Sequence, residues 1–356
     1  MSRSIIGWDI GGANLKAALL NSEANLLNIA QLPCPLWRGL AELETAVKSM
    51  LNAFNLEAAS VYHAVTMTGE LVDCFADRDE GVCEIAALVS QLLGQHVVYY
   101  AANNGFVVHE DVKRFASDIA STNWHASASA LGLVVQEALL IDIGSTTTDI
   151  IVIEHGGVLT AALSDSARLQ DDTLVYTGVV RTPVMALGAK LVFEGTETNV
   201  MAEYFATMAD VYRLTGELLP EHDMAETADG KGKTKLESAR RLARMIGCDL
   251  QLTQEVMSLE KWVALAHVCR SLQINQIRCA ALKRLQPNRL IIGAGAGAFL
   301  VRAIAKQLNQ PYVALSELLL AVLPKTDADK AISIEVCLPA YAVANLAIKQ
   351  QALSQN

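Results

Sequence analysis

One short pattern occurs twice in this chain of 356 residues and constrains its fold more than any other feature. In both copies a run of apolar residues ends in Asp-Ile-Gly, and a second apolar run follows after a few small or polar residues. The two aspartates, Asp9 and Asp142, lie 133 positions apart. A repeat of that length indicates two copies of a whole folding unit, because the repeats of solenoid proteins are much shorter, at roughly 20 to 50 residues. The sequence therefore predicts two related lobes that face each other.

Each copy of the pattern predicts a β-hairpin that runs on into a third strand. The spacing of apolar residues along the rest of the chain predicts further strands and helices, which alternate as in an α/β protein. The expected strands are residues 4–9, 15–20, 61–67, 97–100, 138–142, 148–153 and 290–292, with third hairpin strands that begin at residues 26 and 158. The expected helices are residues 40–54, 82–93, 201–214 and 235–246.

The repeat also sets the expected domain boundaries. Residues 1–130 form the first lobe, and a C-terminal helix at about residues 338–352 packs back on it. Residues 131–337 form the second lobe, with a helical insertion at about residues 200–287. Within that insertion, residues 221–235 are polar and contain glycine, so we expect an exposed, mobile loop there.

Composition excludes several classes of protein. The 28 basic and 38 acidic side chains give a net charge of −10, which argues against nucleic acid as a partner, because such a surface must be basic. No apolar stretch reaches the roughly 20 residues that a membrane span requires. The seven cysteines are scattered without a CxxC pair, so we expect reduced thiols in a cytoplasmic protein. The sequence leaves homo-oligomerisation open.

The residues of the two turns suit an anionic ligand. Glycine lets a ligand approach the backbone amides, which bind phosphate oxygens, and a carboxylate at the end of a strand can hold a hydrated Mg²⁺. We therefore predict Asp9 and Asp142 as Mg²⁺ ligands. The expected contacts to phosphate are Gly11, Gly12, Asn14 and Lys16 in the first hairpin and Gly144, Ser145, Thr146 and Thr147 in the second.

Other candidate residues lie beyond the turns. Asp149 adds a carboxylate to the second hairpin, where the first hairpin has Lys16. The run from Gly293 through Gly295 to Gly297 is either a wall for a nucleotide base or a turn that needs close packing. Arg181 either binds phosphate or forms a surface ion pair. Lys231 either closes over a diphosphate as part of a lid or belongs to a solvated charge cluster.

Together the three glycine-bearing turns resemble the superfamily of actin, hexokinase and the large heat-shock ATPases. That resemblance implies an α/β fold with two ribonuclease-H-like lobes and a central ligand cleft, and a ligand such as ATP or another diphosphate with Mg²⁺. The chain has neither a Walker loop nor a complete GxGxxG fingerprint. Ala13 and Asn14 stand where kinases of the superfamily usually have a hydroxyl residue, which weakens the case for ATP at the first turn.

Three longer segments narrow the resemblance. The segment Thr66-Met-Thr-Gly-Glu-Leu-Val-Asp73 is similar to the hydantoinase A/oxoprolinase group. The segments from Leu174 to Pro183 and from Ala225 to Lys231 are similar to its small single-chain branch, which is linked to tetrahydromethanopterin-dependent one-carbon metabolism. The activity assigned within that branch is a furan-methanamine synthase of methanofuran biosynthesis. It joins an aminomethylfuran diphosphate to the phenol of a glutamyl-tyramine or tyrosine acceptor and releases pyrophosphate.

The resemblance implies roles for several carboxylates. A phenol with a pKa of about 10 needs a base, and Asp149 and Glu70 are the candidates. Asp142 would act through the metal. Glu70 or Glu80 would hold the substrate ammonium. Two rival functions stay open at this point. One is an ATP-dependent small-molecule kinase or ATP-coupled amidohydrolase, and the other is a non-catalytic nucleotide-binding scaffold.

Overall fold

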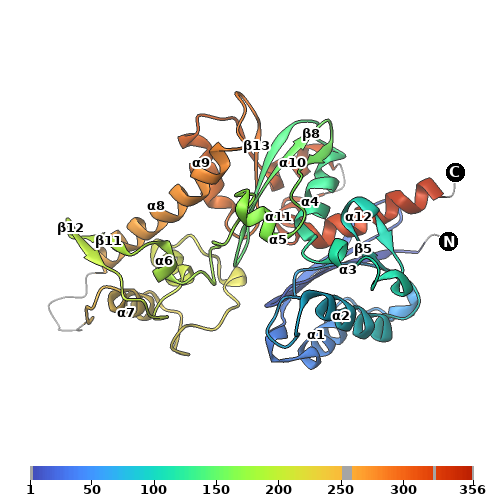
Figure 1. Cartoon of the computed structure of the whole chain (residues 1–356), viewed down its shortest axis with the longest axis horizontal. Helices are drawn as coiled ribbons and strands as arrows, with labels where there is room; N and C mark the ends of the chain where they lie inside the picture. The colour runs from blue at the N-terminus through green and yellow to red at the C-terminus, as the bar shows by residue number, and fades with distance from the viewer. Residues whose placement is uncertain (1–2, 251–258, 324–325, 355–356) are drawn as a thin grey trace. The chain divides into compact units, whose positions relative to one another are not determined.

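The computed structural model describes residues 3–250, 259–323 and 326–354 (Figure 1). Contacts between residues divide the chain into two compact units. Unit 1 comprises Met1–Leu140, Ile151–Asp171 and Val313–Asn356, and unit 2 comprises Ile141–Ile150 and Asp172–Tyr312. This division differs from the predicted lobe boundaries, which stay a prediction. The predicted insertion at residues 200–287 includes residues 251–258, which lie outside the described part of the chain.

Unit 1 contains the first hairpin and the sheet that grows from it. The strands are β1 (Ile5–Ile10), β2 (Asn14–Leu20), β3 (Leu26–Pro33), β4 (Tyr62–Met67), β5 (Val97–Tyr100) and β6 (Phe106–Val107). They lie in the order β3-β2-β1-β4-β5-β6. Strand β1 is antiparallel to β2 and parallel to β4, and β4 is parallel to β5. An antiparallel meander followed by parallel strands is the arrangement of a ribonuclease-H-like sheet, and the predicted strands of this unit are confirmed.

Helices and one further strand complete unit 1. They are α1 (Leu40–Ala53), α2 (Arg78–Leu93), α3 (Ala116–Ile119), α4 (Asn123–Gly132), β9 (Gly157–Leu159), α5 (Asp165–Gln170), α10 (Leu315–Val322), α11 (Ala328–Val336) and α12 (Leu338–Ser354). Short 3-10 helices span Leu36–Arg38, Ala58–Ser60, Ala102–Asn104 and His109–Asp111. Helix α12 is the last element of the unit.

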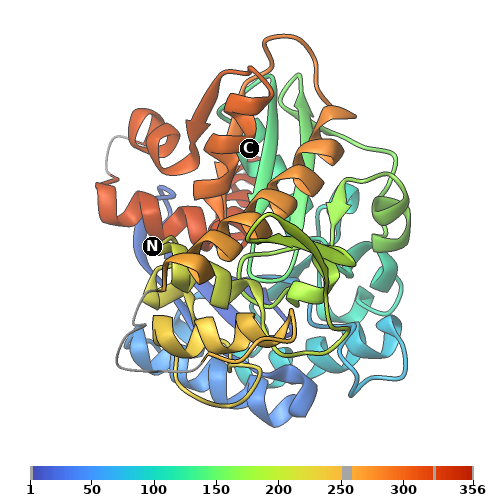
Figure 2. The same cartoon turned by 90° about the vertical axis from the view of Figure 1, so that its left-hand side faces the viewer.

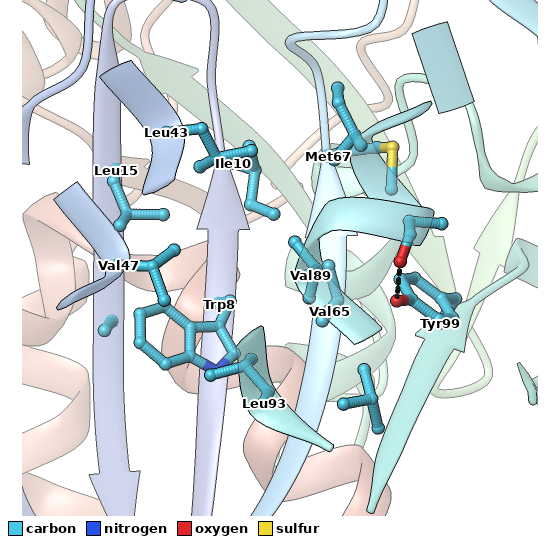
Figure 3. Packing of buried hydrophobic residues seen from close by; sticks show 14 of the residues in the cluster. Trp8, Ile10, Leu15, Leu43, Val47, Val65, Met67, Val89, Leu93 and Tyr99 are labelled. Carbon is cyan, nitrogen blue, oxygen red and sulfur yellow. Dashed lines mark hydrogen bonds between the residues drawn. The ribbon is translucent and has the colours of Figure 1, made fainter. Parts of the chain in front are cut away.

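Alternation along β1 sends its side chains to opposite faces of the sheet. Trp8 and its even-numbered neighbours pack with Val47 of α1 and Val89 of α2 in the apolar core (Figure 3). Gly7 faces the other way, toward α12. A Cβ atom on Gly7 would collide with the backbone of Ala340, so only glycine lets this helix approach the strand so closely. Asp9 has the same parity as Gly7 and therefore lies on the α12 face.

The second hairpin belongs to a sheet with the same plan. Its strands are β7 (Ala138–Ile143), β8 (Thr148–Glu154), β10 (Leu174–Val175), β13 (Ile291–Ala294) and β14 (Tyr312–Ala314). They lie in the order β10-β8-β7-β13-β14, and β9 also pairs with β8. Figure 2 shows β7 and β8 as two long green strands that run side by side. Each sheet thus places its hairpin next to a later strand, which confirms the predicted α/β class with ribonuclease-H-like sheets.

Unit 2 carries the segment that was predicted as a helical insertion. Besides its sheet, unit 2 contains the hairpin β11 (Lys190–Phe193) and β12 (Thr196–Asn199), and the helices α6 (Met208–Thr215), α7 (Lys235–Arg244), α8 (Glu260–Leu282) and α9 (Ala298–Gln307). Short 3-10 helices span Val184–Leu187 and Pro220–His222. The prediction that a helix begins at residue 201 was wrong. Helix α6 begins after Thr207, because the Asp210 carboxylate accepts a hydrogen bond from the Thr207 amide in a capping box.

Among the described residues, no single helix is both long and apolar enough to cross a membrane. Helices α11 and α12 meet that criterion only when they are taken together, across a bend of 99°.

Candidate functional site

The first Asp-Ile-Gly turn, in unit 1, is a tight turn covered by other segments of the unit. The Gly11 amide donates to the Asn14 carbonyl at 3.0 Å and closes the turn. The Gly12 carbonyl accepts a hydrogen bond from the Leu36 amide at 3.1 Å. A Cβ atom on Gly12 would lie 2.9 Å from Val72 Cγ1, so the chain itself fills the space beside this glycine.

The charges of the first hairpin neutralise each other. Asp9 and Lys16 are directly opposite in the register of β1 and β2, and their charged atoms are 3.7 Å apart. The Asp9 side chain is 5% exposed and that of Lys16 is 23% exposed. Lys16 of the same hairpin is therefore a cation partner of Asp9.

The second turn, in unit 2, repeats the geometry of the first. The Gly144 amide donates to the Thr147 carbonyl at 2.9 Å. The Gly144 carbonyl accepts from the Val179 amide, and the Ser145 carbonyl accepts from the Val180 amide, each at 3.0 Å. A Cβ atom on Gly144 would meet only the Thr147 carbonyl, at 3.5 Å, which is ordinary van der Waals contact. The glycine of this turn is therefore more open than those of the first.

Both turns are fixed at a second point, where the isoleucine after the aspartate offers its carbonyl to a later glycine. Ile10 accepts from the amides of Thr68 and Gly69 at 2.9 and 3.0 Å. Ile143 accepts from the Gly297 amide at 2.8 Å. The Thr-Met-Thr-Gly segment of unit 1 thus plays the same structural part as the glycine-rich turn of unit 2.

The glycine-rich turn owes its composition to close packing. A Cβ atom on Gly295 would lie closer than 3.0 Å to the Asp142 carboxylate and the Ile143 carbonyl, and one on Gly297 would lie 2.5 Å from Ile143 Cγ2. Gly295 also has a φ of +81°, a conformation that favours glycine. This contact accounts for the glycines structurally. A role of Gly293 or Gly295 beside a nucleotide base stays a prediction.

Carboxylates dominate the second hairpin. Asp142 is the second-last residue of β7 and Asp149 the second residue of β8, and both are half-buried. Asp149 occupies the position of Lys16, counted from the aspartate of its own turn. Among the described residues, no group of three or more His, Cys, Asp or Glu side chains could hold a metal ion. Mg²⁺ needs only one or two protein carboxylates when water and phosphate complete its shell, so a role of Asp9 or Asp142 as a metal ligand stays a prediction.

Sequence reasoning missed a buried amide that supports the second turn. Gln273 of α8 is fully buried, and its Nε2 donates to Thr177 Oγ1 at 2.8 Å and to the Gly178 carbonyl at 2.9 Å. Tyr212 Oη donates to the other end of the same amide. A Cβ atom on Gly178 would lie 2.5 Å from the Thr146 amide nitrogen. A lone glutamine on the apolar face of α8 was the available sequence signal.

Glu70 and Glu80, the candidates for the substrate ammonium, have different environments. Glu80 is exposed and caps α2, because its carboxylate accepts from the Ala76 amide at 2.5 Å while its own amide donates to Asp77. Glu70 is completely buried, and burial raises the pKa of its carboxyl above the ordinary value. Its hydrogen-bond partner is the hydroxyl of Ser121.

Arg181 and Lys231 lie at different depths in unit 2. The Arg181 amide donates to the Ser145 carbonyl at 2.9 Å, which places this residue beside the second turn. Lys231 is exposed, and its amide donates to the Asp229 carboxylate at 3.2 Å. Arg241, fully buried, donates to Asp229 at 2.9 Å. The binding roles of Arg181 and Lys231 stay predictions.

The segment 221–235 is not simply the exposed loop that its composition predicted. Arg213 of α6 pairs with Asp223 at 2.6 Å, and the Asp223 side chain is only 8% exposed. Arg213 and Arg241 also share the buried Asp210 carboxylate, each at 2.8 Å. These ion pairs fasten the segment to α6 and α7, so the exposed part is limited to residues 230–235 and a few other positions.

The two sheets define a protein of the ribonuclease-H-like fold class. A nucleotide-free structure of acetone carboxylase is similar in fold, with a TM-score of 0.50 and 9% identity. The match covers 84% of this chain and 66% of the acetone carboxylase chain. The chain belongs to the hydantoinase/oxoprolinase family, whose model matches residues 62–321.

Two curated relatives carry one name, (4-{4-[2-(γ-L-glutamylamino)ethyl]phenoxymethyl}furan-2-yl)methanamine synthase. The protein from Methanocaldococcus jannaschii is 35% identical over 256 residues, which cover 72% of this chain and 75% of that protein. The protein from Methanococcus vannielii is 31% identical over 160 residues, which cover 45% of this chain and 72% of that protein.

Proposed function

We propose that this chain is a transferase that forms an aryl ether in the biosynthesis of a methanofuran-type cofactor. It joins an aminomethylfuran diphosphate to the phenol of a glutamyl-tyramine or tyrosine acceptor and releases pyrophosphate. The observation that carries this proposal is the 35% identity to the curated synthase over 75% of that protein. The family match over residues 62–321 agrees with it.

The proposed reaction makes simple demands on the protein. The bond between the furfuryl carbon and the diphosphate oxygen breaks, and its electron pair leaves with the diphosphate. The furan ring spreads the positive charge that develops on carbon, so ionisation is easy once the leaving group is stabilised. The phenolic oxygen then forms the new bond and gives up its proton. The protein must stabilise the diphosphate, align the phenol and exclude water.

The second turn is suited to the diphosphate. Its glycine is open, and the hydroxyl residues Ser145, Thr146 and Thr147 are partly exposed. We place a hydrated Mg²⁺ on Asp142 and Asp149, where it would neutralise the charge of the leaving group. Arg181, beside the same turn, is the proposed cation for a phosphate oxygen. Lys231 is the proposed contact from the segment that Arg241 fastens.

A direct assay tests the function. The purified chain is incubated with Mg²⁺, the aminomethylfuran diphosphate and a glutamyl-tyramine, tyramine or tyrosine acceptor, and the ether product and pyrophosphate are measured. We expect equal amounts of both products and no need for ATP. Formation of ADP from ATP without the furan would instead identify a kinase or an ATP-coupled amidohydrolase. An absence of turnover with every substrate would favour a binding scaffold.

The variant Asp142→Asn sharpens the assay. It keeps the shape of the side chain but removes the charge that we assign to the metal. We expect ether formation to fall by at least about 100-fold while the melting temperature hardly changes. Glu203→Gln, an exposed carboxylate of the same unit, is the matched control and should keep full activity. A large drop in the melting temperature of Asp142→Asn would show that this aspartate is structural.

A further inference from the structure

A neighbouring segment of unit 2, residues 177–182, holds the second turn through its backbone. Two carbonyls of the turn, those of Gly144 and Ser145, accept three hydrogen bonds from amides of this segment. The donors, at distances of 2.9 to 3.0 Å, are the amides of Val179, Val180 and Arg181. The carbonyls of the turn therefore face the segment.

These bonds also fix the direction of two amides in the turn. In a trans peptide, the N–H and the C=O of one peptide unit point in opposite directions. The amides of Ser145 and Thr146 follow the two carbonyls in the same peptide units, so they face away from the segment. Among the described residues, no backbone carbonyl accepts a hydrogen bond from either amide. Two backbone donors are thus directed to where an anion such as phosphate can bind.

Gln273 of α8 binds the segment with its side-chain amide. The side chain is fully buried, and Nε2 donates to Thr177 Oγ1 at 2.8 Å and to the Gly178 carbonyl at 2.9 Å. Because a carbonyl can only accept, the NH₂ end of the amide must face Gly178. The oxygen end must then face Tyr212, whose hydroxyl donates to it. Both N–H groups and the oxygen are used, which fixes the orientation of the amide.

Helix α6 holds both Gln273 and the far end of the segment. The Thr182 carbonyl accepts from the Met208 amide at 2.8 Å, at the start of this helix. Tyr212 of the same helix is fully buried, and its ring packs edge-on against Phe299. Burial raises the pKa of the Tyr212 phenol, so its hydroxyl keeps the proton that it donates to Gln273.

We propose that Gln273, oriented by Tyr212, is a positioning residue for the diphosphate of the substrate. This proposal rests on the proposed function and deepens it, because it concerns the turn at which we place the diphosphate. A Cβ atom on Gly178 would lie 2.5 Å from the Thr146 nitrogen, so the backbone that Gln273 holds packs directly on that peptide. The amides of Ser145 and Thr146 then meet the phosphate oxygens in a fixed direction. Donors fixed in advance stabilise the charge that grows on the leaving group.

The affinity for pyrophosphate in the presence of Mg²⁺, measured by calorimetry, is the first test and needs no turnover. Gln273→Leu keeps roughly the size of the side chain and removes both donors, so we expect binding to weaken by about 10-fold. Tyr212→Phe keeps the ring and removes only the hydroxyl. It should weaken binding by about 3-fold, and it carries the test alone if Gln273→Leu does not fold.

Gln276→Leu is the matched control. Gln276 lies on the same helix, and its Nε2 donates to the Leu187 carbonyl at 3.1 Å, outside the segment. The control removes the same kind of bond and should bind pyrophosphate as the wild type does. Equal weakening in Gln273→Leu and Gln276→Leu would overturn the proposal, and so would unchanged binding in both Gln273→Leu and Tyr212→Phe.

The kinetic constants of ether formation are the second test. Gln273→Leu should raise the KM for the aminomethylfuran diphosphate and lower kcat, each by about 10-fold, and leave the KM for the phenolic acceptor unchanged. A variant that merely folds less completely lowers kcat and leaves both KM values unchanged. That result would show a structural role and overturn the proposal.

The two tests together assign any failure. A chain that forms no ether but binds pyrophosphate with the expected order of affinities contradicts the proposed function and supports the positioning role of Gln273. A chain that forms the ether with wild-type constants in both Gln273→Leu and Tyr212→Phe supports the function and contradicts the positioning role. A wild type that neither binds pyrophosphate nor forms the ether contradicts both.

Discussion

The two Asp-Ile-Gly hairpins have the same backbone and opposite charge balance. Each turn is closed by a glycine amide, at 3.0 Å in the first and 2.9 Å in the second, and each isoleucine carbonyl binds a later glycine. The first hairpin then pairs Asp9 with Lys16 at 3.7 Å. The second has Asp149 in place of that lysine. One hairpin therefore pairs its aspartate with a lysine, whereas the other has a second carboxylate at the position of that lysine.

The turns also differ in the space around their glycines. A Cβ atom on Gly11 would lie 3.0 Å from the Asn14 carbonyl and one on Gly12 2.9 Å from Val72, whereas one on Gly144, the counterpart of Gly11, would lie 3.5 Å from the Thr147 carbonyl. An ion-paired, covered turn is suited to holding a sheet together, and an open turn with two carboxylates is suited to a metal and a phosphate. The comparison suggests that a duplicated unit has divided its work between structure and ligand binding. The following predictions test that division.

The largest effect is expected at Gly295, whose contact with the second turn is the tightest. Gly295→Ala places a methyl group against the Asp142 carboxylate in a backbone conformation of φ +81°. We expect the free energy of unfolding to fall by at least about 3 kcal/mol. Gly69→Ala, in the segment that binds the first turn, should cost only about 1 to 2 kcal/mol, because its closest contact is the flexible end of Leu36, at 2.7 Å. Urea unfolding measures both values.

Gly230→Ala is the control for backbone strain alone. Gly230 also has a positive φ, of +65°, but a Cβ atom there would meet nothing within 4 Å. We expect it to cost about 1 kcal/mol. If Gly69→Ala were as destabilising as Gly295→Ala, the two turns would be equally tight and this part of the comparison would be wrong.

A smaller effect should separate stability from activity at the charged positions. Lys16→Met keeps the packing of the side chain but removes the ion pair with the buried Asp9. We expect it to lower the free energy of unfolding by about 2 kcal/mol, since the lysine is partly exposed. Asp149→Asn keeps the shape of the half-buried side chain and removes its charge, so we expect a change within about 0.5 kcal/mol but at least about 100-fold less ether. Urea unfolding and initial rates measure the two effects.

A loss of stability in Asp149→Asn equal to that in Lys16→Met would contradict the division. It would mean that Asp149 supports the hairpin as Lys16 does, and the metal assignment would lose its basis.

Much of the fold could be predicted because the repeat encodes it locally. The alternation of residues in β1 and β2, and the Asp-Ile-Gly turn between them, determine a hairpin without help from distant segments. The start of α6 was missed, because the Thr207 and Asp210 cap outweighs the apolar spacing that begins at residue 201. The hairpin formed by β11 and β12 was missed as well. Its turn residues Glu194 and Gly195 both have positive φ, of 48° and 80°, a local signal that was present.

The candidate site was less predictable, because its partners are distant in sequence. Ser121 is 51 positions from Glu70, and Gln273 is 96 positions from Thr177, so no local pattern connects them. The acidic and basic residues of the segment 221–235 suggested exposure. Their burial depends on Arg213 and Arg241, which belong to helices on either side. Such pairings arise from tertiary packing, which composition does not reveal.

The smallest predicted effect comes from a histidine that supports the first hairpin and has no counterpart in the second. Trp8, next to Asp9, donates its indole N–H to His63 Nδ1 at 3.1 Å, and His63 Nε2 bonds to the Ala58 carbonyl at 3.0 Å. Ile141 occupies the place of Trp8 in the second hairpin. The bond from Trp8 requires an unprotonated Nδ1 and hence the neutral imidazole, and burial lowers the pKa of His63 to about 4.

Because the unfolded chain binds the proton more readily than the folded one, stability should be lost as the pH falls from about 6.5 toward about 4. His63→Gln can accept from Trp8 and donate to Ala58 without titrating. Between about pH 7 and about pH 6, we expect the wild type to lose roughly 0.7 kcal/mol more free energy of unfolding than His63→Gln. His125, whose pKa burial also lowers to about 4, contributes equally to both proteins and cancels in the difference. Identical slopes would mean that folding leaves the pKa of His63 unchanged, which would contradict the prediction.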